Sequence, residues 1–419
     1  MTQSPSWPII VVTGANSGVG FGACHRLLLQ LSSKNPRDAQ PQYDFHVREE
    51  NLEALDTSYD GLTLILACRS KQRGEAAREK LYTLVDQHIA RLRTSSEYDG
   101  HAGTFRNNLT ISVHTVDLSH IQSVFQFADE LTRRYPYISH LICNAGVASF
   151  AKINWLVATK QLLTDWIGAV TSPLYYVQTV GERTADGLGW VWQCNVFGHY
   201  VLFRALEHQL ARYKTSTGAR VIWMSSHEAN PQFYNPNDWQ LLQSEHSYEC
   251  SKYQMDMISL QLDRRALQSQ TVAAPVIRHI TVLPGVAGTN IASALLGRLS
   301  ALGMYMSFYI ARWMGSPFHL ISAFKASISA VHLCLVPIMF LPVASVVATL
   351  GTTDPTTRGE VGVRYVSQSD RLGRERVGMM KVMQSKAEES QTEELLKNCE
   401  RLLETFCEAE GRPYPSLAR

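Results

Sequence analysis

The sequence predicts one α/β domain built on a doubly wound parallel β-sheet. From Pro8 to about Gly285, short runs of Val, Ile and Leu alternate with longer helical patterns, as expected where helices cover both faces of a parallel sheet. The short runs are almost unbroken in apolar residues, which strands covered on both faces require. Apolar residues make up 45% of the 419 residues and charged residues 18%, a balance that supports a sizeable core.

Six segments carry the strand pattern. The first is followed by a helical pattern over about 18–31 and then by a polar stretch, about 32–60, that contains Pro36 and Pro41. We expect this stretch to be a surface insertion in a core domain that spans residues 8–290. The predicted strands are 9–12, 62–66, 109–116, 140–143, 220–224 and 277–283.

A glycine-rich turn follows the first strand, in Thr13-Gly14-Ala15-Asn16-Ser17-Gly18-Val19-Gly20. Gly14 permits a tight turn, Gly18 lets backbone approach a phosphate, and Gly20 allows the helix to pack closely on the strand. A pyrophosphate would lie at the helix N-terminus, where unpaired N–H groups favour negative charge. The turn therefore predicts a Rossmann-type dinucleotide site. Its expected residues are Gly14, Ser17, Gly18, Val19 and Gly20.

The end of the second strand predicts which dinucleotide binds. Arg69, with Lys71 or Arg73 close by, stands where an acidic residue would hold the 2′-hydroxyl of NAD. An arginine accommodates a 2′-phosphate instead, so we expect NADPH as the cofactor. Asp117 follows the third strand and has two interpretations: it accepts a hydrogen bond from the adenine amino group, or it caps the next helix.

Tyr248 and Lys252 form the candidate catalytic pair. Their four-residue spacing puts both side chains on one face of a helix. A phenol has a pKa of about 10 and is a poor base near neutrality, but a cation beside it favours the phenolate. Tyr248 can then exchange a proton with a substrate oxygen while hydride moves to or from a nicotinamide. A surface Tyr–Lys pair is the ordinary alternative interpretation.

Polar side chains elsewhere support this site. Ser225, Ser226 and Asn144 each follow a predicted strand, at the carboxyl edge where open α/β sheets bind ligands. A serine hydroxyl there can hold a carbonyl oxygen or donate to a developing alkoxide. Asn195, in a helical stretch, offers an amide that can support a water relay to Lys252.

These motifs resemble those of the short-chain dehydrogenase/reductases over about the first 290 residues, with TGxxxGxG, Asn-Ala-Gly, Asn195, a strand-end serine and YxxxK in order. Four further blocks, at 165–173, 193–200, 247–252 and 309–317, resemble the fungal-type 3-keto-steroid reductases of sterol biosynthesis. The resemblance implies NADPH-dependent reduction of a 3-ketosterol to the 3β-hydroxysterol during C-4 demethylation. It also implies a sterol substrate and, as partners, other C-4 demethylation enzymes.

Carried over by position, the resemblance assigns roles to individual residues. Tyr248 would be the proton donor, Lys252 the group that lowers its pKa, and Ser226 the partner of the substrate oxygen. Asn195 would complete the tetrad. The gap between Ser226 and Tyr248 is longer than in most short-chain enzymes, which leaves Ser225 as an alternative. The NADPH site would be lined by Val19, Arg69, Asp117, Asn144, Tyr248, Lys252, Val286 and Thr289.

The character of the chain changes after Gly285. Residues 291–353 are rich in Leu, Met and aromatic side chains, and we expect them to form a lid over a large apolar substrate. The stretch 326–350 has no Lys, Arg, Asp or Glu and is long enough to cross a bilayer, but Pro337 and Pro342 interrupt it. Two hypotheses stay open: a buried helix followed by an irregular segment, or a membrane contact. The expected location is the cytosolic face of the endoplasmic reticulum membrane, with lipid droplets as a second site.

The last region, 354–419, is charged. We expect a long helix over 379–410 that docks on the core through a leucine stripe. The stripe consists of Leu395, Leu396, Leu402 and Leu403.

Three functions compete. The formal charge of +2 argues against a nucleic-acid partner, and eight scattered cysteines without a CxxC pair argue against a metal site. Besides the 3-keto-steroid reductase, a 17-keto-steroid or retinal reductase on the same fold would share the catalytic residues. A non-catalytic scaffold of a sterol-enzyme complex would have no reason to keep the tetrad. Nothing in the sequence fixes the oligomeric state.

Overall fold

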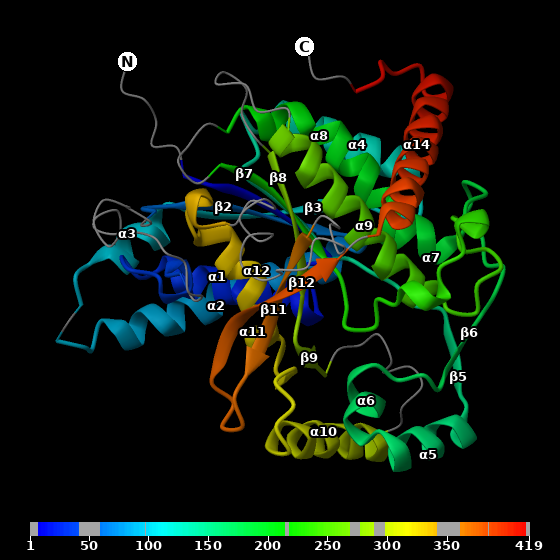
Figure 1. Ribbon diagram of the computed structural model, residues 1–419. Coiled ribbons are helices and arrows are strands. Elements are labelled where there is room, and N and C mark those ends of the chain that lie inside the picture. The colour runs from blue at the N-terminus through cyan, green and yellow to red at the C-terminus, as the bar shows by residue number, and fades with distance from the viewer. Residues whose placement is uncertain are drawn as a thin grey trace.

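The computed structural model describes residues 7–41, 59–96, 98–213, 218–268, 277–288, 298–341, 361–383 and 385–415. The central sheet of this part of the chain consists of β1 (Ile9–Thr13), β2 (Leu62–Cys68), β3 (Leu109–Thr115), β4 (His140–Cys143), β7 (Ala219–Met224), β8 (Ile277–Leu283), β11 (Val361–Ser369) and β12 (Glu375–Met383). Their order across the sheet is β12-β11-β8-β7-β4-β1-β2-β3 (Figure 1). All neighbours are parallel except the antiparallel pair β11 and β12.

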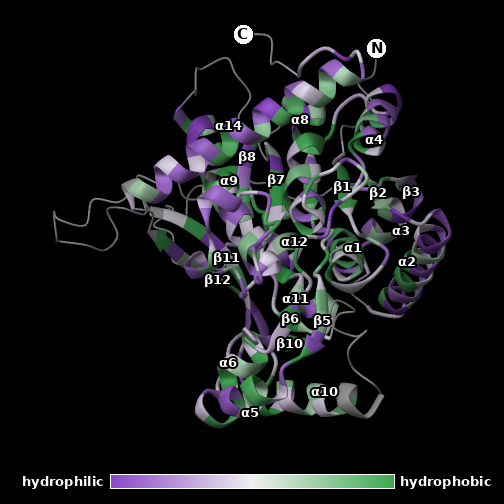
Figure 2. Cartoon of the chain, turned by 90° about the vertical axis from the view of Figure 1, so that its right-hand side faces the viewer, coloured by the Kyte–Doolittle hydropathy of each residue, from purple (hydrophilic) through white to green (hydrophobic). Residues whose placement is uncertain are grey.

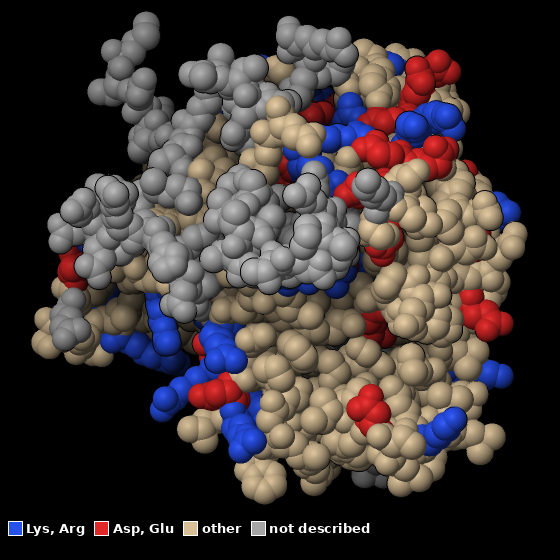
Figure 3. Space-filling model, viewed as in Figure 1, with Lys and Arg blue, Asp and Glu red and all other residues tan. Residues whose placement is uncertain are grey.

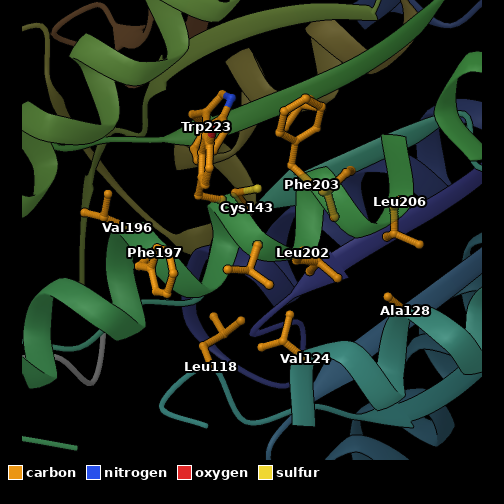
Figure 4. Close-up of a cluster of buried hydrophobic side chains, with 14 of the residues drawn as sticks. Leu118, Val124, Ala128, Cys143, Val196, Phe197, Leu202, Phe203, Leu206 and Trp223 are labelled. Atoms are coloured by element: carbon orange, nitrogen blue, oxygen red, sulfur yellow. The ribbon is translucent and has the colours of Figure 1, made fainter. Parts of the chain in front are cut away.

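Helices cover both faces of this sheet. They are α1 (Gly18–Leu31), α2 (Lys71–Leu92), α3 (His101–Asn107), α4 (Ile121–Arg134), α8 (Gly198–Ala211), α9 (Ser247–Gln268), α12 (Ile328–Leu335) and α14 (Lys386–Ala409). One face carries α4, α8, α9 and α14, and the other carries α1, α2, α3 and α12. Figure 4 shows part of the first core, where side chains of α4 and α8 meet Cys143 of β4 and Trp223 of β7.

The predicted doubly wound α/β fold is confirmed. All six predicted strands exist, and two of them, 140–143 and 277–283, have the predicted bounds. The first helix spans the predicted residues, Gly18–Leu31. The apolar runs predicted these strands because most of them, β1, β4, β7 and β8 in full, are buried between two helical layers and need no polar residues; the edge strand β3 exposes Thr110 and Thr115.

The beginning of the predicted insertion packs into the core. A short 3-10 turn, η1 (Arg37–Ala39), buries Asp38, whose carboxylate accepts from the guanidinium of Arg26 on α1, with Nη2–Oδ1 at 2.9 Å. The segment is therefore anchored where the sequence predicted only exposed polar chain. Residues 42–58 of the insertion lie outside the described part of the chain.

The apolar stretch from residue 326 is buried rather than exposed, as far as it is described. Every residue of α12, from Ile328 to Leu335, is buried. The N–H groups of Arg220 donate to the carbonyls of Leu333 and Val336 at the end of this helix, and η7 (Ile338–Phe340) follows. The buried-helix hypothesis therefore holds for 326–341, and 342–350 lie outside the described residues. No helix in the described ranges is both long and apolar enough to cross a membrane.

The prediction for the C-terminal region is partly wrong. A helix was expected over 379–410, but Glu375–Met383 form β12, and the helix α14 begins only at Lys386. β11 and β12 form a hairpin that continues the sheet beside β8. Methionine and lysine favour helix, and they obscured the strand pattern because β12 is an edge strand with polar residues. Pairing with β11 outweighs this local preference.

Further elements lie outside the main layers. An arm between β4 and α8 contains β5 (Phe150–Ile153), α5 (Trp155–Thr164), α6 (Trp166–Thr171) and β6 (Tyr176–Gln178), and β5 pairs with β6. After β8, the chain forms β9 (Val286–Ala287), α10 (Arg298–Trp313), β10 (His319–Ile321) and α11 (Ala323–Ala326). Both views place α5, α6 and α10 together at one end of the molecule (Figures 1 and 2). The short turns are α7 (Trp190–Trp192), η3 (Gln193–Phe197), η4 (Pro231–Phe233) and η5 (Pro236–Asp238).

Candidate active site

The glycine-rich turn lies where β1 meets α1. Gly14 has φ +67° and Gly18 has φ +55°, values that side chains rarely tolerate. A Cβ on Gly20 would lie 2.6 Å from the Gly14 carbonyl oxygen and 2.4 Å from Nδ2 of Asn144. Conformation therefore requires glycine at the first two positions, and close packing requires it at the third.

A buried chain of hydrogen bonds connects this turn to Asn195. The hydroxyl oxygen of Thr13 accepts from the N–H groups of Asn144 and Ala145, at 2.9 and 3.0 Å. The ring of His199 continues the chain, because Nδ1–H donates to the Asn195 carbonyl and Nε2 accepts from the Thr13 hydroxyl, both at 2.9 Å. Burial lowers the pKa of His199 to about 4, so the ring is neutral near pH 7, as this arrangement requires.

The residues at this edge of the sheet fit a dinucleotide with a 2′-phosphate. Ser17 precedes α1 without capping it through its side chain, so the first helical N–H groups remain available to phosphate. Arg69 directly follows β2, is exposed, and has no hydrogen bond or ion pair with any residue that the structure describes. Arg69 and Asp117 both act electrostatically on the Cys194 thiol, which places them on the same side of the molecule.

Asp117 does not cap the following helix. Its Oδ1 accepts from the N–H and the hydroxyl of Ser119, at 3.0 and 2.6 Å, while His120 occupies the N-cap position of α4. The helix-cap interpretation is therefore wrong, and Asp117 closes a turn instead. Its contact with adenine stays a prediction.

The other two predicted cofactor residues that the structure describes are Val19 and Val286. Val19 lies in the first turn of α1 and packs against the core on the α1 side of the sheet. Val286 begins β9 and donates its N–H to the carbonyl of Phe318 at 2.7 Å. Thr289 lies outside the described residues.

Asn195 sits in a π-helical segment, η3, at the start of α8. Its Oδ1 accepts from the N–H of Val147 at 2.8 Å, and its Nδ2 donates to the Val147 carbonyl and to the Ser251 hydroxyl, both at 2.9 Å. Single π-helical turns of this kind occur frequently at functional sites. A Cβ on Gly146 would lie 3.4 Å from Asn195 Oδ1 and 3.6 Å from Lys252 Nζ. Gly146 therefore lies between the amide and the ammonium group, where a water relay was predicted.

Tyr248 and Lys252 both lie on α9 and are 6% and 4% exposed. Nζ of Lys252 donates to the carbonyl of Met224 at 2.8 Å and lies 5.8 Å from the centre of the Tyr248 ring. The ring of Phe150, from the arm, meets Tyr248 edge-on at 5.7 Å. The structure thus brings Tyr248 and Lys252 together at the carboxyl end of β7, where Phe150 of the arm contacts the Tyr248 ring.

Ser225 and Ser226 have different surroundings. The Ser225 hydroxyl donates to the Lys252 carbonyl at 3.3 Å, on the backbone of α9. The Ser226 hydroxyl accepts from the N–H of Glu228 at 3.1 Å and lies close enough to the Tyr248 phenol to lower its pKa. The geometry therefore favours Ser226 as the partner of a substrate oxygen.

Burial dominates the electrostatics of the site. It raises the pKa of Tyr248, and the Glu228 carboxylate raises it further, whereas the Ser226 hydroxyl lowers it. Burial lowers the pKa of Lys252 to about 8 and raises that of Glu228 to about 8. The phenol is held in its protonated form, which suits a proton donor.

Three residues of this site had not been predicted from the sequence. Gln178 of β6 accepts, through Oε1, from the N–H of Tyr248 and the hydroxyl of Ser247, both at 2.9 Å. Glu228 has a buried Oε2 without a hydrogen-bond donor among the described residues. His199 joins the turn to Asn195. Glu228 is two residues after Ser226 and His199 is four residues after Asn195, but only the fold reveals their contacts. No sequence pattern near Gln178 indicates its role.

The fold and this site together define a short-chain dehydrogenase/reductase. The mostly parallel sheet carries the glycine-rich turn after β1, which lies between β4 and β2, and Asn195, Ser226, Tyr248 and Lys252 converge beside this turn. The chain is also 30% identical over 319 residues to a 3-keto-steroid reductase of Debaryomyces hansenii, covering 76% of this chain and 78% of that protein. A Candida albicans 3-keto-steroid reductase is 32% identical over 319 residues, with the same shares covered. The chain belongs to the 3-keto-steroid reductase family.

Other comparisons add less. A 3-keto-steroid reductase of Eremothecium gossypii is 36% identical over 217 residues, but the match covers only 52% of this chain and 60% of that protein. Among solved structures, the L-sorbose reductase of Gluconobacter frateurii, complexed with NADPH and L-sorbose, is 16% identical with a TM-score of 0.46, covering 80% of this chain and 92% of that chain. No family model matches the sequence.

Proposed function

We propose that this protein reduces the 3-keto group of a sterol to the 3β-hydroxyl with NADPH, as a step of C-4 demethylation in sterol biosynthesis. The observation that carries the proposal is the buried Tyr248 phenol, with Nζ of Lys252 5.8 Å from its ring centre and the Ser226 hydroxyl close enough to lower its pKa, in a chain that belongs to the 3-keto-steroid reductase family. Two hydroxyl donors beside each other can hold one carbonyl oxygen between them.

The raised pKa of Tyr248 suits reduction. A ketone gains negative charge on its oxygen as it is reduced, and the phenol donates its proton there. Ser226 donates a second hydrogen bond to the same oxygen. NADPH, when bound, supplies the hydride that adds to the carbonyl carbon. Burial holds Tyr248 protonated until that moment, because the phenolate would be poorly solvated in this site.

Lys252 and Asn195 organise the proton supply. The Lys252 ammonium is fixed by the Met224 carbonyl, and its lowered pKa of about 8 keeps it ready to pass on a proton near neutrality. Asn195 holds Val147 and Ser251 through its side chain, and Ser251 donates to the Tyr248 carbonyl at 2.7 Å. Asn195 therefore fixes the start of α9, and with it the position of Tyr248.

The described residues offer specific groups to NADPH. The turn Gly14–Gly20 and the N-terminus of α1 would hold the pyrophosphate, and the free guanidinium of Arg69 would hold the 2′-phosphate. These groups meet at one edge of the sheet, since Asn144 joins the turn to the end of β4. An Arg69→Asp variant should prefer NADH, which equilibrium titration of both dinucleotides would measure.

A reductase of another lipid carbonyl, such as retinal or a 17-keto-steroid, is the alternative with the same catalytic residues. The decisive experiment is to follow NADPH oxidation with a 4-methyl-3-ketosterol, retinal and estrone as separate substrates. We expect turnover with the ketosterol and a loss of at least about a hundredfold in Tyr248→Phe. Activity confined to retinal or estrone would refute the substrate, and turnover that survives Tyr248→Phe would refute the mechanism.

We also propose that the protein works at the cytosolic face of the endoplasmic reticulum membrane or on lipid droplets, beside other C-4 demethylation enzymes. Sterols partition into lipid, so an enzyme that takes them directly from a membrane avoids their low solubility in water. A fluorescent fusion that stays diffuse in the cytosol of living cells would contradict this location, and affinity purification from the same cells tests the partners.

A further inference from the structure

Three helices at one end of the molecule form a surface that we call the tip, made of α5, α6 and α10. α6 packs against both of its neighbours, and the two views in Figures 1 and 2 show the three helices side by side. His319 of β10 joins them to the rest of the fold, since its Nε2 lies 3.1 Å from the Val170 carbonyl of α6 and its ring lies 5.4 Å from that of Phe308 on α10.

The tip gathers the exposed apolar side chains of the protein. The described part of the chain exposes seventeen large apolar side chains. Ten of them belong to α5 or α10, and two more, Leu174 and Met314, follow closely after α6 and α10. Trp155, Leu163 and Trp313 are 70%, 82% and 75% exposed. The twelve are Trp155, Leu156, Leu162, Leu163, Leu174, Leu302, Tyr305, Met306, Tyr309, Ile310, Trp313 and Met314. A patch of this kind marks an interaction surface.

The helices of the tip are turned with their larger apolar face outward. In α10 the exposed residues 302, 305, 306, 309, 310 and 313 follow helical spacing, so they form one stripe. Among the residues of α10 whose side chains are described, 302–313, the opposite side buries Phe308 and Ala311. α5 behaves in the same way, because it buries Ala158 and Gln161 and exposes Trp155 and Leu163. An amphipathic helix packed for the core of this chain alone would have the reverse orientation.

The charges of the tip are mainly positive. Lys160 of α5 is exposed, as is Lys152 of β5, three residues before α5 begins, and the guanidinium of Arg312 lies over the Tyr309 ring, 5.0 Å from its centre. The one carboxylate of the arm helices, Asp165, accepts from the N–H of Gly168 and so caps α6. In Figure 3 the lower end of the molecule, where these helices lie, shows few charged side chains. Apolar and aromatic side chains with a few cations are the composition of surfaces that rest on anionic lipid.

The stem of the arm reaches the catalytic tyrosine. Phe150 of β5 stacks on Tyr176 of β6 at 4.5 Å and meets the Tyr248 ring edge-on. Gln178, at the end of β6, accepts from the N–H of Tyr248. The stem therefore connects the tip to the site and places aromatic side chains beside the phenol.

We propose that the tip docks on the surface of an anionic phospholipid bilayer, from which the enzyme takes its apolar substrate; the second clause rests on the function proposed above. Trp155, Leu163 and Trp313 enter the interface between headgroups and acyl chains, while Lys152 and Lys160 contact lipid phosphates. A second copy of the chain fits this surface less well, because two facing tips would bring the same cations together. The surface is distinct from α12, every residue of which is buried.

Flotation with phospholipid vesicles tests the docking surface. The full-length protein is mixed with vesicles of phosphatidylcholine alone or with added phosphatidylserine, and the bound fraction is measured. We expect stronger binding with phosphatidylserine, weakened by salt and by Lys152→Glu/Lys160→Glu. The variant Trp155→Ser/Leu163→Ser/Trp313→Ser should lower the partition coefficient by about a hundredfold.

The control variant is Val180→Ser/Met379→Ser, which removes two apolar side chains that are 44% and 41% exposed but lie outside the tip; it should float like the wild type. Equal flotation of the wild type and the tip variant would overturn the proposal. The proposal would also be overturned if light scattering showed the wild type to be a dimer that does not bind vesicles and the tip variant to be a monomer. The tip would then bind a second copy of the chain. The tip variant should still reduce a detergent-solubilised ketosterol. If neither the wild type nor any variant reduces it, the proposed reaction is refuted, but the vesicle result still tests the docking surface.

Discussion

Ser225 and Ser226 are neighbours in the chain with different chemistry. Backbone geometry at the end of β7 turns Ser225 toward the Lys252 carbonyl and leaves Ser226 beside the Tyr248 phenol. The sequence identified the pair but could not choose between them, because the choice depends on the direction in which the chain leaves the strand. The distinction predicts opposite effects for two conservative substitutions.

Ser226→Ala should lower kcat by about a hundredfold or more, because it removes a hydrogen bond to the oxygen that becomes negative. Ser225→Ala should leave kcat within a few-fold of the wild type and lower the free energy of unfolding by about 1 kcal/mol, the value of one buried hydrogen bond. Steady-state kinetics and urea denaturation of both variants measure this. The reverse ranking would show that the roles are exchanged.

Glu228 is a carboxyl group that the proposed reaction does not use, yet it faces the reacting phenol. Its pKa is raised to about 8, chiefly by burial and also by Glu249, while Lys252 acts in the opposite direction. Above about pH 8 its negative charge opposes formation of the Tyr248 phenolate, which the reverse reaction, oxidation of an alcohol, requires as base.

Glu228→Gln should therefore move the alkaline rise of kcat/KM for alcohol oxidation to lower pH. Removing a negative neighbour favours the phenolate, so its pKa falls. The measurement is a pH profile in the oxidative direction, with Glu245→Gln, an exposed carboxylate nearby on the chain, as the control. Superimposable profiles of the wild type and Glu228→Gln would contradict this electrostatic link.

Elements with uniform surroundings were the ones that the sequence predicted. The buried parallel strands and α1 read clearly because packing on both sides demands one residue type throughout. Part of β12 was mistaken for helix because its pairing with β11 depends on partners six to twenty-two residues away in the chain, while the local residue preference favoured a helix. The π-helical turn at Asn195 was also not predictable, since no residue pattern distinguishes one extra residue per turn.

Gln178 shows how an element of the arm controls an element of the core. Its Oε1 accepts two hydrogen bonds from the first residues of α9, Ser247 and Tyr248. It therefore acts as a helix cap supplied by another strand, and it fixes the phenol relative to Ser226.

Gln178→Ala should lower the free energy of unfolding by about 1–2 kcal/mol, as loss of a cap does. It should lower kcat by about tenfold or more because the phenol loses its position, while the dissociation constant of NADPH stays unchanged. Thermal unfolding, kinetics and fluorescence titration separate the three effects. Gln126→Ala, on the exposed side of α4, is the matched control. A rise in the NADPH dissociation constant equal to the loss in kcat would point to general distortion instead.

At the scale of the whole molecule, the sequence established that residues 291–353 are rich in apolar side chains but not which of these side chains face outward. The stretch that resembled a membrane span packs against the sheet as α12, with the buried Arg220 holding its end. The helix α10, with a similar composition, exposes its apolar stripe. Helical spacing defines a stripe in both cases, and only the assembled fold decides whether the sheet covers it.

α14 lies at the opposite end of the chain from β1 and belongs to the same core. Its buried residues Leu395, Leu396, Cys399, Leu403 and Cys407 pack with α4, α8 and α9. The predicted leucine stripe is thus correct for three of its four members, since Leu402 is only half-buried. One core implies that unfolding of α14 is coupled to unfolding of the sheet, as in other single domains.

Leu403→Ala should therefore lower the free energy of unfolding of the whole protein by about 2–5 kcal/mol, because it leaves a cavity between α14 and the helices beneath it. Leu402→Ala, one residue earlier on the same helix, should cost about 1 kcal/mol or less, since it leaves no enclosed cavity. Both variants make the same leucine-to-alanine change on the same helix, so the difference between their free energies of unfolding reports the difference in burial. Denaturant unfolding followed by circular dichroism and by tryptophan fluorescence should give coincident transitions in each variant. A separate early transition in Leu403→Ala, with the tryptophan signal of Trp223 in the central sheet unchanged, would show instead that α14 docks as an independent unit.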